Sequence, residues 1–146
     1  MATYVDHLTA DETGATTATL ANTSLNFAVT SGVYYAFRFY VLWRTTLATV
    51  GLKLGLTTPT FTVFGAQVRI MILATGTASE LQGSIIASGG SVSGTDAAAT
   101  NTDYIAVIEG VILPSATGTL MVQYAAETTG ATVTMRNGSA GELVET

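Results

Sequence analysis

The chain has 146 residues, a length that suits one domain with its own hydrophobic core. It contains no cysteine, which excludes disulfides, thiol catalysis and thiolate metal sites. A net charge of −5, with only five lysines and arginines, leaves no basic stripe for a phosphate backbone, so nucleic-acid binding is not expected.

The first 24 residues are polar, rich in threonine and weakly periodic. This composition predicts an extended N-terminal arm, containing at most a short strand, ahead of a β-domain formed by residues 25–146. Residues 25–29 alternate apolar and polar side chains, and residues 30–32 read Thr-Ser-Gly, which is a turn signal. The pattern predicts that this short strand forms a hairpin with the strand that follows it.

The strongest strand signal lies at residues 33–44, which read V-Y-Y-A-F-R-F-Y-V-L-W-R. One face of this strand must be a core, because its positions are all apolar or aromatic: Val33, Tyr35, Phe37, Phe39, Val41 and Trp43. The opposite face mixes Arg38, Tyr40 and Arg44 with apolar residues, so we expect it to meet a second sheet or a second subunit. Only 10% of the residues are charged, against about 25% in an average soluble domain, which favours self-association.

The rest of the chain has short alternating or apolar runs between turn residues. They predict strands at residues 50–57, 61–73, 104–113, 119–127, 132–135 and 142–146. Gly65 is expected to mark a bulge, residues 114–118 a hairpin loop, and residues 104–113 a central strand covered on both faces. Residues 74–103 predict long loops around one short strand at 84–87. Together these elements predict an all-β fold, a jelly-roll-like antiparallel β-sandwich of about eight strands.

Groups that could carry chemistry are few. His7, the single histidine, lies beside Asp6 in the arm, where an exposed residue is a simpler interpretation than a metal or acid–base site. Glu109, inside an apolar strand, is interpreted as an edge or interface residue paired with Arg38 or Arg69 rather than as a perturbed catalytic acid. The sequence has no Gly-x-Ser-x-Gly elbow, and neither an enzyme activity nor a cofactor is predicted.

Calcium binding, sugar binding and export are also unsupported by the sequence. Asp96, Asn101 and Asp103 share one loop-like segment whose oxygens can hold calcium, but their spacing does not match the twelve-residue calcium loop. The tyrosines and Trp43 can line a sugar-binding surface, although alternate positions on strands favour core or interface. The N-terminus lacks the basic and apolar regions of a signal peptide, and apolar runs are strand-sized, so neither secretion nor membrane insertion is expected.

Five segments carry a resemblance to a known family: residues 8–32, 34–45, 51–56, 108–127 and 132–139. They include A-D-E-T-G, Y-Y-A-F-R-F-Y-V-L-W-R and I-E-G-V-I-L-P-S-A-T-G, and in pattern and order they resemble a β-rich structural module of tailed-bacteriophage virions. The resemblance implies a compact, commonly trimeric, jelly-roll-like domain on the outside of the particle, without catalytic residues. No coiled-coil or β-helical shaft precedes the module, which favours a capsid decoration or head-fibre protein over a full tail fibre.

The prediction is therefore a non-enzymatic virion protein on the capsid surface, a homotrimer that binds the major capsid protein and stabilises the capsid. The expected contact residues are Arg38, Tyr40 and Arg44 in the trimer interface and Tyr4, Val5 and Leu8 in the capsid-binding arm. Deletion of residues 1–20 is expected to abolish capsid binding and leave a folded trimer. The alternative is a tail-tip or fibre module that binds host polysaccharide through loops at residues 74–103. A glycan hydrolase ranks last, because the sequence identifies no carboxylate pair for it.

Overall fold

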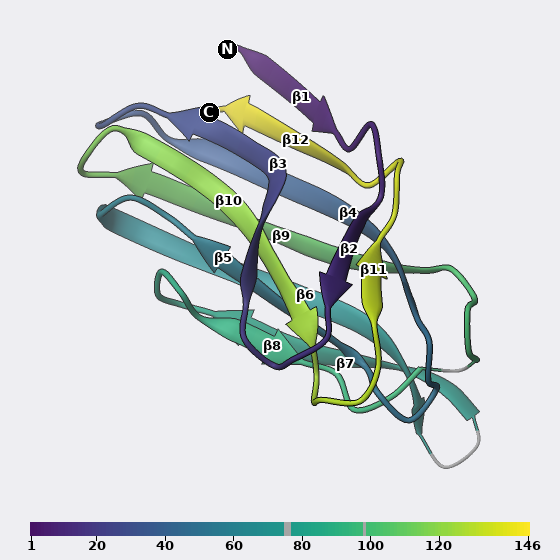
Figure 1. Ribbon diagram of the computed structural model, residues 1–146. Coiled ribbons are helices and arrows are strands. Elements are labelled where there is room, and N and C mark those ends of the chain that lie inside the picture. The colour runs from purple at the N-terminus through teal and green to yellow at the C-terminus, as the bar shows by residue number, and fades with distance from the viewer. Residues whose placement is uncertain (75–76, 98) are drawn as a thin grey trace.

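The computed structural model describes residues 1–74, 77–97 and 99–146, and all regular structure in these residues is β-strand (Figure 1). Twelve strands follow in chain order: β1 (Thr3–His7), β2 (Glu12–Ala15), β3 (Ala21–Val29), β4 (Tyr35–Thr45), β5 (Leu52–Thr57), β6 (Phe61–Ala74), β7 (Thr77–Ile85), β8 (Ser91–Ser93), β9 (Tyr104–Pro114), β10 (Gly118–Ala126), β11 (Val133–Met135) and β12 (Ala140–Glu145). This described part of the chain also contains no helix long and apolar enough to cross a membrane.

The strands form two antiparallel sheets that pack against each other around one core (Figure 1). The large sheet has the order β1-β12-β4-β9-β6-β7; β11 pairs with β4 further along that strand, and β2 pairs with β11. The small sheet has the order β3-β10-β5-β8. The predicted class, an all-β sandwich of antiparallel strands, is confirmed.

Strand β4 lies in the middle of the large sheet and supplies the aromatic centre of the core. Its inward side chains are buried, as the sequence predicted, and Phe39 and Trp43 have no exposed surface. From the small sheet, Phe27 stacks on Phe39 with ring centroids 5.6 Å apart. Each large apolar side chain buried in this way contributes about 1.5–3 kcal/mol of hydrophobic stabilisation. Alternation on β4 therefore fixes which face of the large sheet is covered.

Two predicted hairpins are wrong, because in each case the turn carries the chain from one sheet to the other. Residues 25–29 belong to β3 in the small sheet, whereas β4 lies in the large sheet. Residues 114–118 likewise connect β9 in the large sheet with β10 in the small sheet. The two strands of each pair therefore pack against each other across the core instead of forming hydrogen bonds side by side in one sheet. Local turn chemistry does not distinguish these two arrangements.

The segment from residue 74 to 103 holds more strand than its composition predicted. Strand β7 pairs with β6 over nine residue pairs, and the short β8 pairs with β5. Leu81 and Ile85 face inward against the core, although the surrounding polar residues have weak strand propensity. Pairing with the long strand β6 overrides that propensity. The register shift in β6 lies between Phe61 and Val63, so the bulge expected at Gly65 is displaced by a few residues.

The residues expected to form an N-terminal arm add two strands to the large sheet. Strand β1 pairs with β12 at one edge, and β2 pairs with β11. Leu8, between these strands, is only 3% exposed and belongs to the core. Ala15 is also buried in the core. The first fifteen residues therefore take part in the sandwich of their own chain.

Candidate functional site

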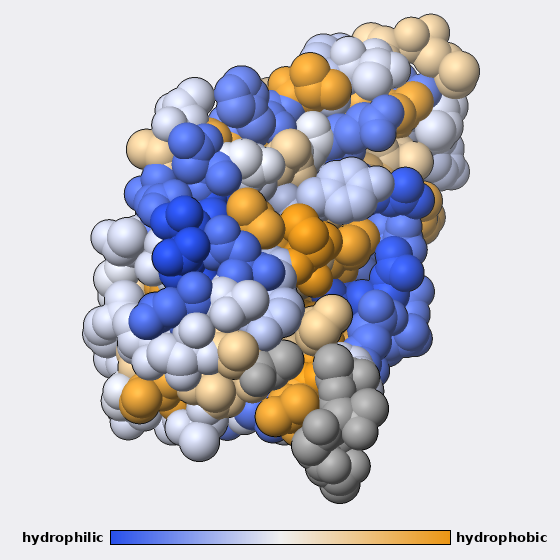
Figure 2. Space-filling view, turned by 90° about the vertical axis from the view of Figure 1, so that its right-hand side faces the viewer, coloured by the Kyte–Doolittle hydropathy of each residue, from blue (hydrophilic) through white to orange (hydrophobic). Residues whose placement is uncertain are grey.

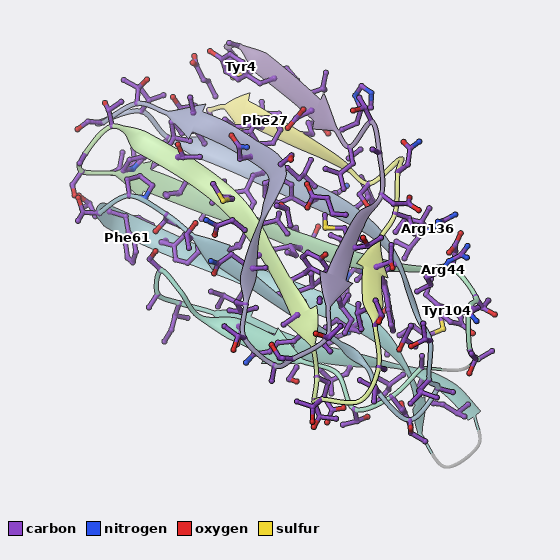
Figure 3. The ribbon with its side chains drawn as sticks, in the orientation of Figure 1. Tyr4, Phe27, Arg44, Phe61, Tyr104 and Arg136 are labelled. Carbon is purple, nitrogen blue, oxygen red and sulfur yellow. The ribbon has the colours of Figure 1, made fainter. Side chains whose placement is uncertain are left out.

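The candidate site is the outer face of the large sheet, the face that points away from the small sheet. It is formed by alternate residues of β12, β4, β9 and β6, namely Ala140, Glu142, Val144, Ala36, Arg38, Tyr40, Leu42, Ile105, Val107, Glu109, Val111, Gly65, Gln67 and Arg69. Tyr40 is 41% exposed, and Ile105 and Val111 are each 50% exposed. Figure 2 looks at the end of the sandwich that carries Arg44 and Tyr104 (Figure 3), beside the outer face, and at that end hydrophobic residues gather between polar ones.

The outer face differs from what the sequence predicted for the covering of β9. The second face of β4 was expected to meet another sheet or another subunit, and β9 was expected to be covered on both sides. Within the described residues no strand or loop of this chain covers the outer face, so β9 is covered on one side only. Apolar side chains remain exposed there beside charged ones, as on surfaces that bind other proteins.

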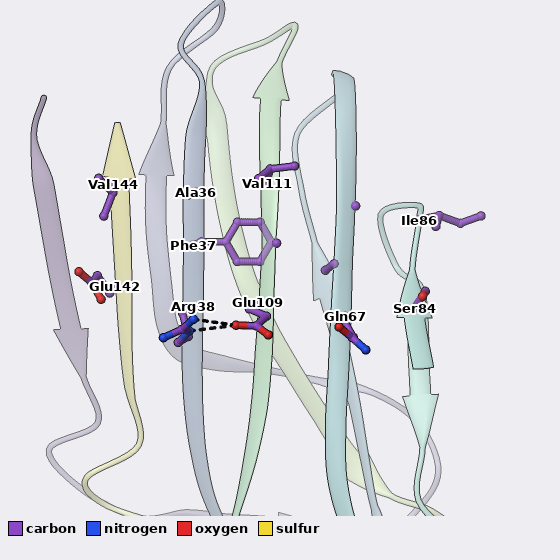
Figure 4. Close-up of a pocket in the computed structure, with 13 residues that line it drawn as sticks. Ala36, Phe37, Arg38, Gln67, Ser84, Ile86, Glu109, Val111, Glu142 and Val144 are labelled. Carbon is purple, nitrogen blue, oxygen red and sulfur yellow. Dashed lines mark hydrogen bonds and ion pairs between the residues drawn. The ribbon is translucent and has the colours of Figure 1, made fainter. Parts of the chain in front are cut away.

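Cross-strand pairing arranges the outer face in rows that run across the strands (Figure 4). An apolar row aligns Val144, Ala36, Val111 and Gly65 from β12, β4, β9 and β6. The next row is polar and aligns Glu142, Arg38, Glu109 and Gln67 from the same four strands. The third row aligns Ala140, Tyr40, Val107 and Arg69. Side chains of contrasting size and charge therefore alternate along each row.

Glu109 is the electrostatic centre of the outer face. Its carboxylate accepts from Arg38, with Nη2 2.9 Å and Nε 3.1 Å from Oε2, and Arg69 Nη2 lies 3.5 Å from Oε1. Arg38 also donates to the Tyr40 hydroxyl at 3.2 Å. Hydrogen bonds to Tyr40 and Glu109 raise the pKa of Arg38. The predicted ion pair of Glu109 is confirmed, with both arginines as partners, but β9 lies between β4 and β6, so Glu109 is not at a sheet edge.

A hollow of about 690 Å³ lies in the outer face above its smallest residues. Its small lining residues include Ala36 of β4, Gly65 of β6 and Gly110 of β9, and a Cβ placed on Gly65 would meet no atom within 4 Å. Val144 and Ile86 border it on the two sides, as Figure 4 shows. No local sequence motif predicts the hollow. Its small residues come from three separate strands, and only the register of these strands brings them together.

The predicted contact residues differ in how accessible they are in the structure. Arg38 and Tyr40 lie on the outer face and are exposed, whereas the third interface residue, Arg44, is held at the end of β4 by Asp103. In the N-terminal segment, Tyr4 donates to the Glu145 carboxylate at 3.0 Å, and Val5 is 79% exposed. Leu8 is buried in its own core, so it is not available for a contact unless the fold opens.

Charged residues at one end of the sandwich form a second cluster (Figure 3). Asp103 lies 2.6 Å from Arg44 Nε and 3.3 Å from Arg136 Nε, and Arg136 also pairs with Asp11. Asp96 instead accepts from the Leu73 backbone N–H at 2.7 Å. Asp96 and Asp103, whose oxygens the sequence analysis considered for calcium, therefore have different partners. No group of three or more His, Cys, Asp or Glu side chains suited to a metal ion occurs in residues 1–74, 77–97 and 99–146.

The Asp103 cluster makes stability depend on pH. The hydrogen bond from Arg44 holds the pKa of Asp103 below its ordinary value. A carboxyl group with a lowered folded-state pKa stabilises the protein above its unfolded pKa of about 3.9 and loses that contribution as the pH falls below it. We expect Asp103→Asn to cost about 1 kcal/mol or less at pH 7, because the pair is one-third exposed, and the cost to shrink below about pH 4. Urea unfolding of both proteins at pH 7 and pH 3 checks this; an equal cost at both pH values would contradict it.

His7 is exposed, as expected, and its backbone N–H donates to the Asp6 carboxylate at 2.9 Å. Asp6 also accepts from the Asn26 backbone N–H at 3.3 Å.

The aromatic residues lie mainly in the core or on strands, as their alternate positions in the sequence suggested. Tyr35, Trp43 and Tyr124 are buried, and the exposed ones stand on or beside strands. The segment considered for polysaccharide binding, residues 74–103, contains β7 and β8 with loops between and after them; residues 75, 76 and 98 lie outside the described residues.

Comparisons with known proteins give little. No protein-family model and no curated protein matches the chain. Among solved structures, a structure of the infectious bursal disease virus Gx strain has a TM-score of 0.33 and 13% identity, over 99% of this chain and 41% of that one. The Gt strain gives a TM-score of 0.31 and 10% identity, over 97% of this chain and 36% of that one. The chain thus spans about two fifths of the first matched structure's length. Similarity this weak assigns neither a fold family nor a function.

Proposed function

We propose that this chain is a non-enzymatic structural protein of the virion surface, a decoration protein that binds the capsid as a homo-oligomer. The observation that carries the structural role is the uncovered outer face of the large sheet, with apolar and charged residues in alternating rows. The virion location rests on the sequence resemblance over residues 8–139. Many weak contacts from repeated copies would add up to stable attachment on a regular capsid lattice.

The free edge of β1 supports a separate role in capsid contact. Strand β1 ends the large sheet and pairs only with β12, so one side of its backbone has no strand partner among the described residues. Such an edge pairs readily with an extended segment of another protein, which becomes an added strand. Val5, 79% exposed, and Tyr4, 45% exposed, flank that edge. In this proposal β1 binds an extended segment of the major capsid protein.

Deletion of the edge strand tests this contact. Removal of residues 1–20 would also remove Leu8 and Ala15 from the core, so the structure indicates a shorter deletion of residues 1–6. We expect the shortened protein to fold and to lose binding to purified capsids that lack the protein. Co-sedimentation measures binding, and circular dichroism and the melting temperature serve as the control for folding. Binding equal to that of the full chain would contradict the role of β1.

Copy number in purified particles tests the decoration role. Decoration of an icosahedral head requires many copies per particle, which quantitative mass spectrometry can measure against the major capsid protein. A ratio near a simple fraction of the capsid subunits is the expected result. A handful of copies per particle would contradict decoration and would favour the tail-tip alternative.

A further inference from the structure

We propose that the outer face of the large sheet binds the same face of a second copy, related by a two-fold axis parallel to the strands and passing between β4 and β9. This names the partner for the self-associating face and so rests on the homo-oligomer of the proposed function. The axis lies at the centre of the sheet order β1-β12-β4-β9-β6-β7. The rotation keeps each row opposite the same row of the partner and reverses its order. It therefore sets β4 opposite β9 and β12 opposite β6.

The apolar row fits its own reversed copy in size. In the order Val144, Ala36, Val111 and Gly65, large and small residues alternate. After reversal, each Val144 lies over a Gly65 of the second copy, and each Val111 lies over an Ala36. The hollow of about 690 Å³ above the small residues then receives valine side chains. Such interdigitation is how two packed sheets form a dense interface.

The polar row fits its reversed copy in charge. Arg38 of one copy lies opposite Glu109 of the other, and the reverse contact forms by symmetry. Glu142, which has no ion pair within the described residues, lies opposite Gln67 and diagonal to Arg69 of the next row. Its carboxylate thereby gains an amide donor and a nearby cation. Beside these contacts, Leu42 of one copy covers Ile105 of the other.

The alternative two-fold axis, in the same plane but perpendicular to the strands along the polar row, is disfavoured by charge. It would set Glu142 against Glu142, Arg38 against Arg38 and Glu109 against Glu109. Like charges in a closed interface are strongly unfavourable. The strand-parallel axis is thus the one that suits both the charges and the side-chain sizes.

The face is also large enough for a stable pair. With the flanking strands β1 and β7 included, six strands spaced about 4.8 Å apart, over roughly seven residues of about 3.3 Å each, give a face of roughly 700 Å². Specific interfaces bury about 600–1,000 Å² of each partner, and this face falls within that range. This self-complementary contact makes a dimer. It differs from the trimer implied by the sequence resemblance, because a cyclic trimer joins two different patches of the subunit.

The test uses Gly65→Leu, because Gly65 has open space in the single chain but faces Val144 of the second copy in the proposed dimer. The matched control is Ala28→Leu, which adds the same side chain at an exposed position of β3 in the small sheet. The purified full chain is expected to have a mass of 30.0 kDa by light scattering, twice the 15.0 kDa chain. Gly65→Leu is expected to raise the dimer dissociation constant by more than about 100-fold, because the clash occurs twice per dimer.

The outcomes separate clearly. Ala28→Leu should remain dimeric, and Val144→Ala added to Gly65→Leu should restore part of the association by making room. If Gly65→Leu fails to fold, as judged by circular dichroism, Val111→Lys replaces it, since it brings a charge onto the Ala36 of the second copy. A mass of 15.0 kDa or 45.0 kDa for the natural sequence, or a folded face variant that dimerises normally, would overturn the proposal. A mass of 15.0 kDa would also contradict the homo-oligomer of the proposed function, whereas 45.0 kDa or a folded face variant that dimerises normally would overturn the dimer alone. The location on the virion depends on none of these results.

Discussion

Replacement of Phe39 by alanine is expected to lower the free energy of unfolding by about 3–5 kcal/mol. Phe39 has no exposed surface and lies between two other rings, with centroid distances of 5.6 Å to Phe27 and 5.9 Å to Phe37. The variant leaves a cavity between the two sheets that rigid strands cannot close. Urea unfolding followed by the fluorescence of the single tryptophan, buried Trp43, measures the loss.

Tyr40→Ala is the matched control for Phe39→Ala, because Tyr40 is the next residue of the same strand and is 41% exposed on the opposite face. At concentrations where the chain is monomeric, we expect this change to cost about 1 kcal/mol or less. Comparable losses for the two variants would contradict the assignment of the covered and uncovered faces of β4.

Gly110→Ala is the second change with a large expected effect, a loss of about 2–4 kcal/mol. A Cβ at this position would collide with the backbone oxygen of Gly65 and would lie 2.8 Å from Phe37 Cζ and 2.9 Å from Ala66 Cα. Two of these three atoms belong to the backbone of β6, so relief requires β9 and β6 to separate. Thermal unfolding by circular dichroism checks the effect.

Gly65→Ala is the control for Gly110→Ala, since it lies on the neighbouring strand at the same level of the sheet. A Cβ there meets nothing within 4 Å in the single chain, so at concentrations where the chain is monomeric the melting temperature is expected to change little. A loss at Gly65 as large as that at Gly110 would show that strand glycines matter for backbone freedom in general and not for close approach of β9 to β6.

The sequence predicted most accurately those features that depend on the residues of a single strand. The two faces of β4 were assigned from alternation alone, because side chains on successive strand residues point to opposite sides. The ion-pair role of Glu109 followed from a lone carboxylate in an apolar strand of a chain with few cations. These predictions need no knowledge of which strands are neighbours.

The sequence predicted least accurately those features that depend on which strands lie next to each other. The turns before β4 and before β10 read as hairpin turns, yet each joins the two sheets, because an inward-facing apolar pattern looks the same in either sheet. The strand predicted at residues 84–87 meets only the end of β7, and the rest of β7 was missed since its strand conformation depends on pairing with β6. The hollow and the matched rows of the outer face depend on register among four strands, which alternation along one strand does not contain.

The proposed role as a structural protein of the capsid surface requires the chain to be distributed over the head of the particle. Intact virions would be labelled with gold-tagged antibody against the chain and viewed by electron microscopy, with virions that lack the protein as the control. The proposal predicts dense gold over the whole head. Gold confined to the tail end, or no labelling above the control, would contradict it.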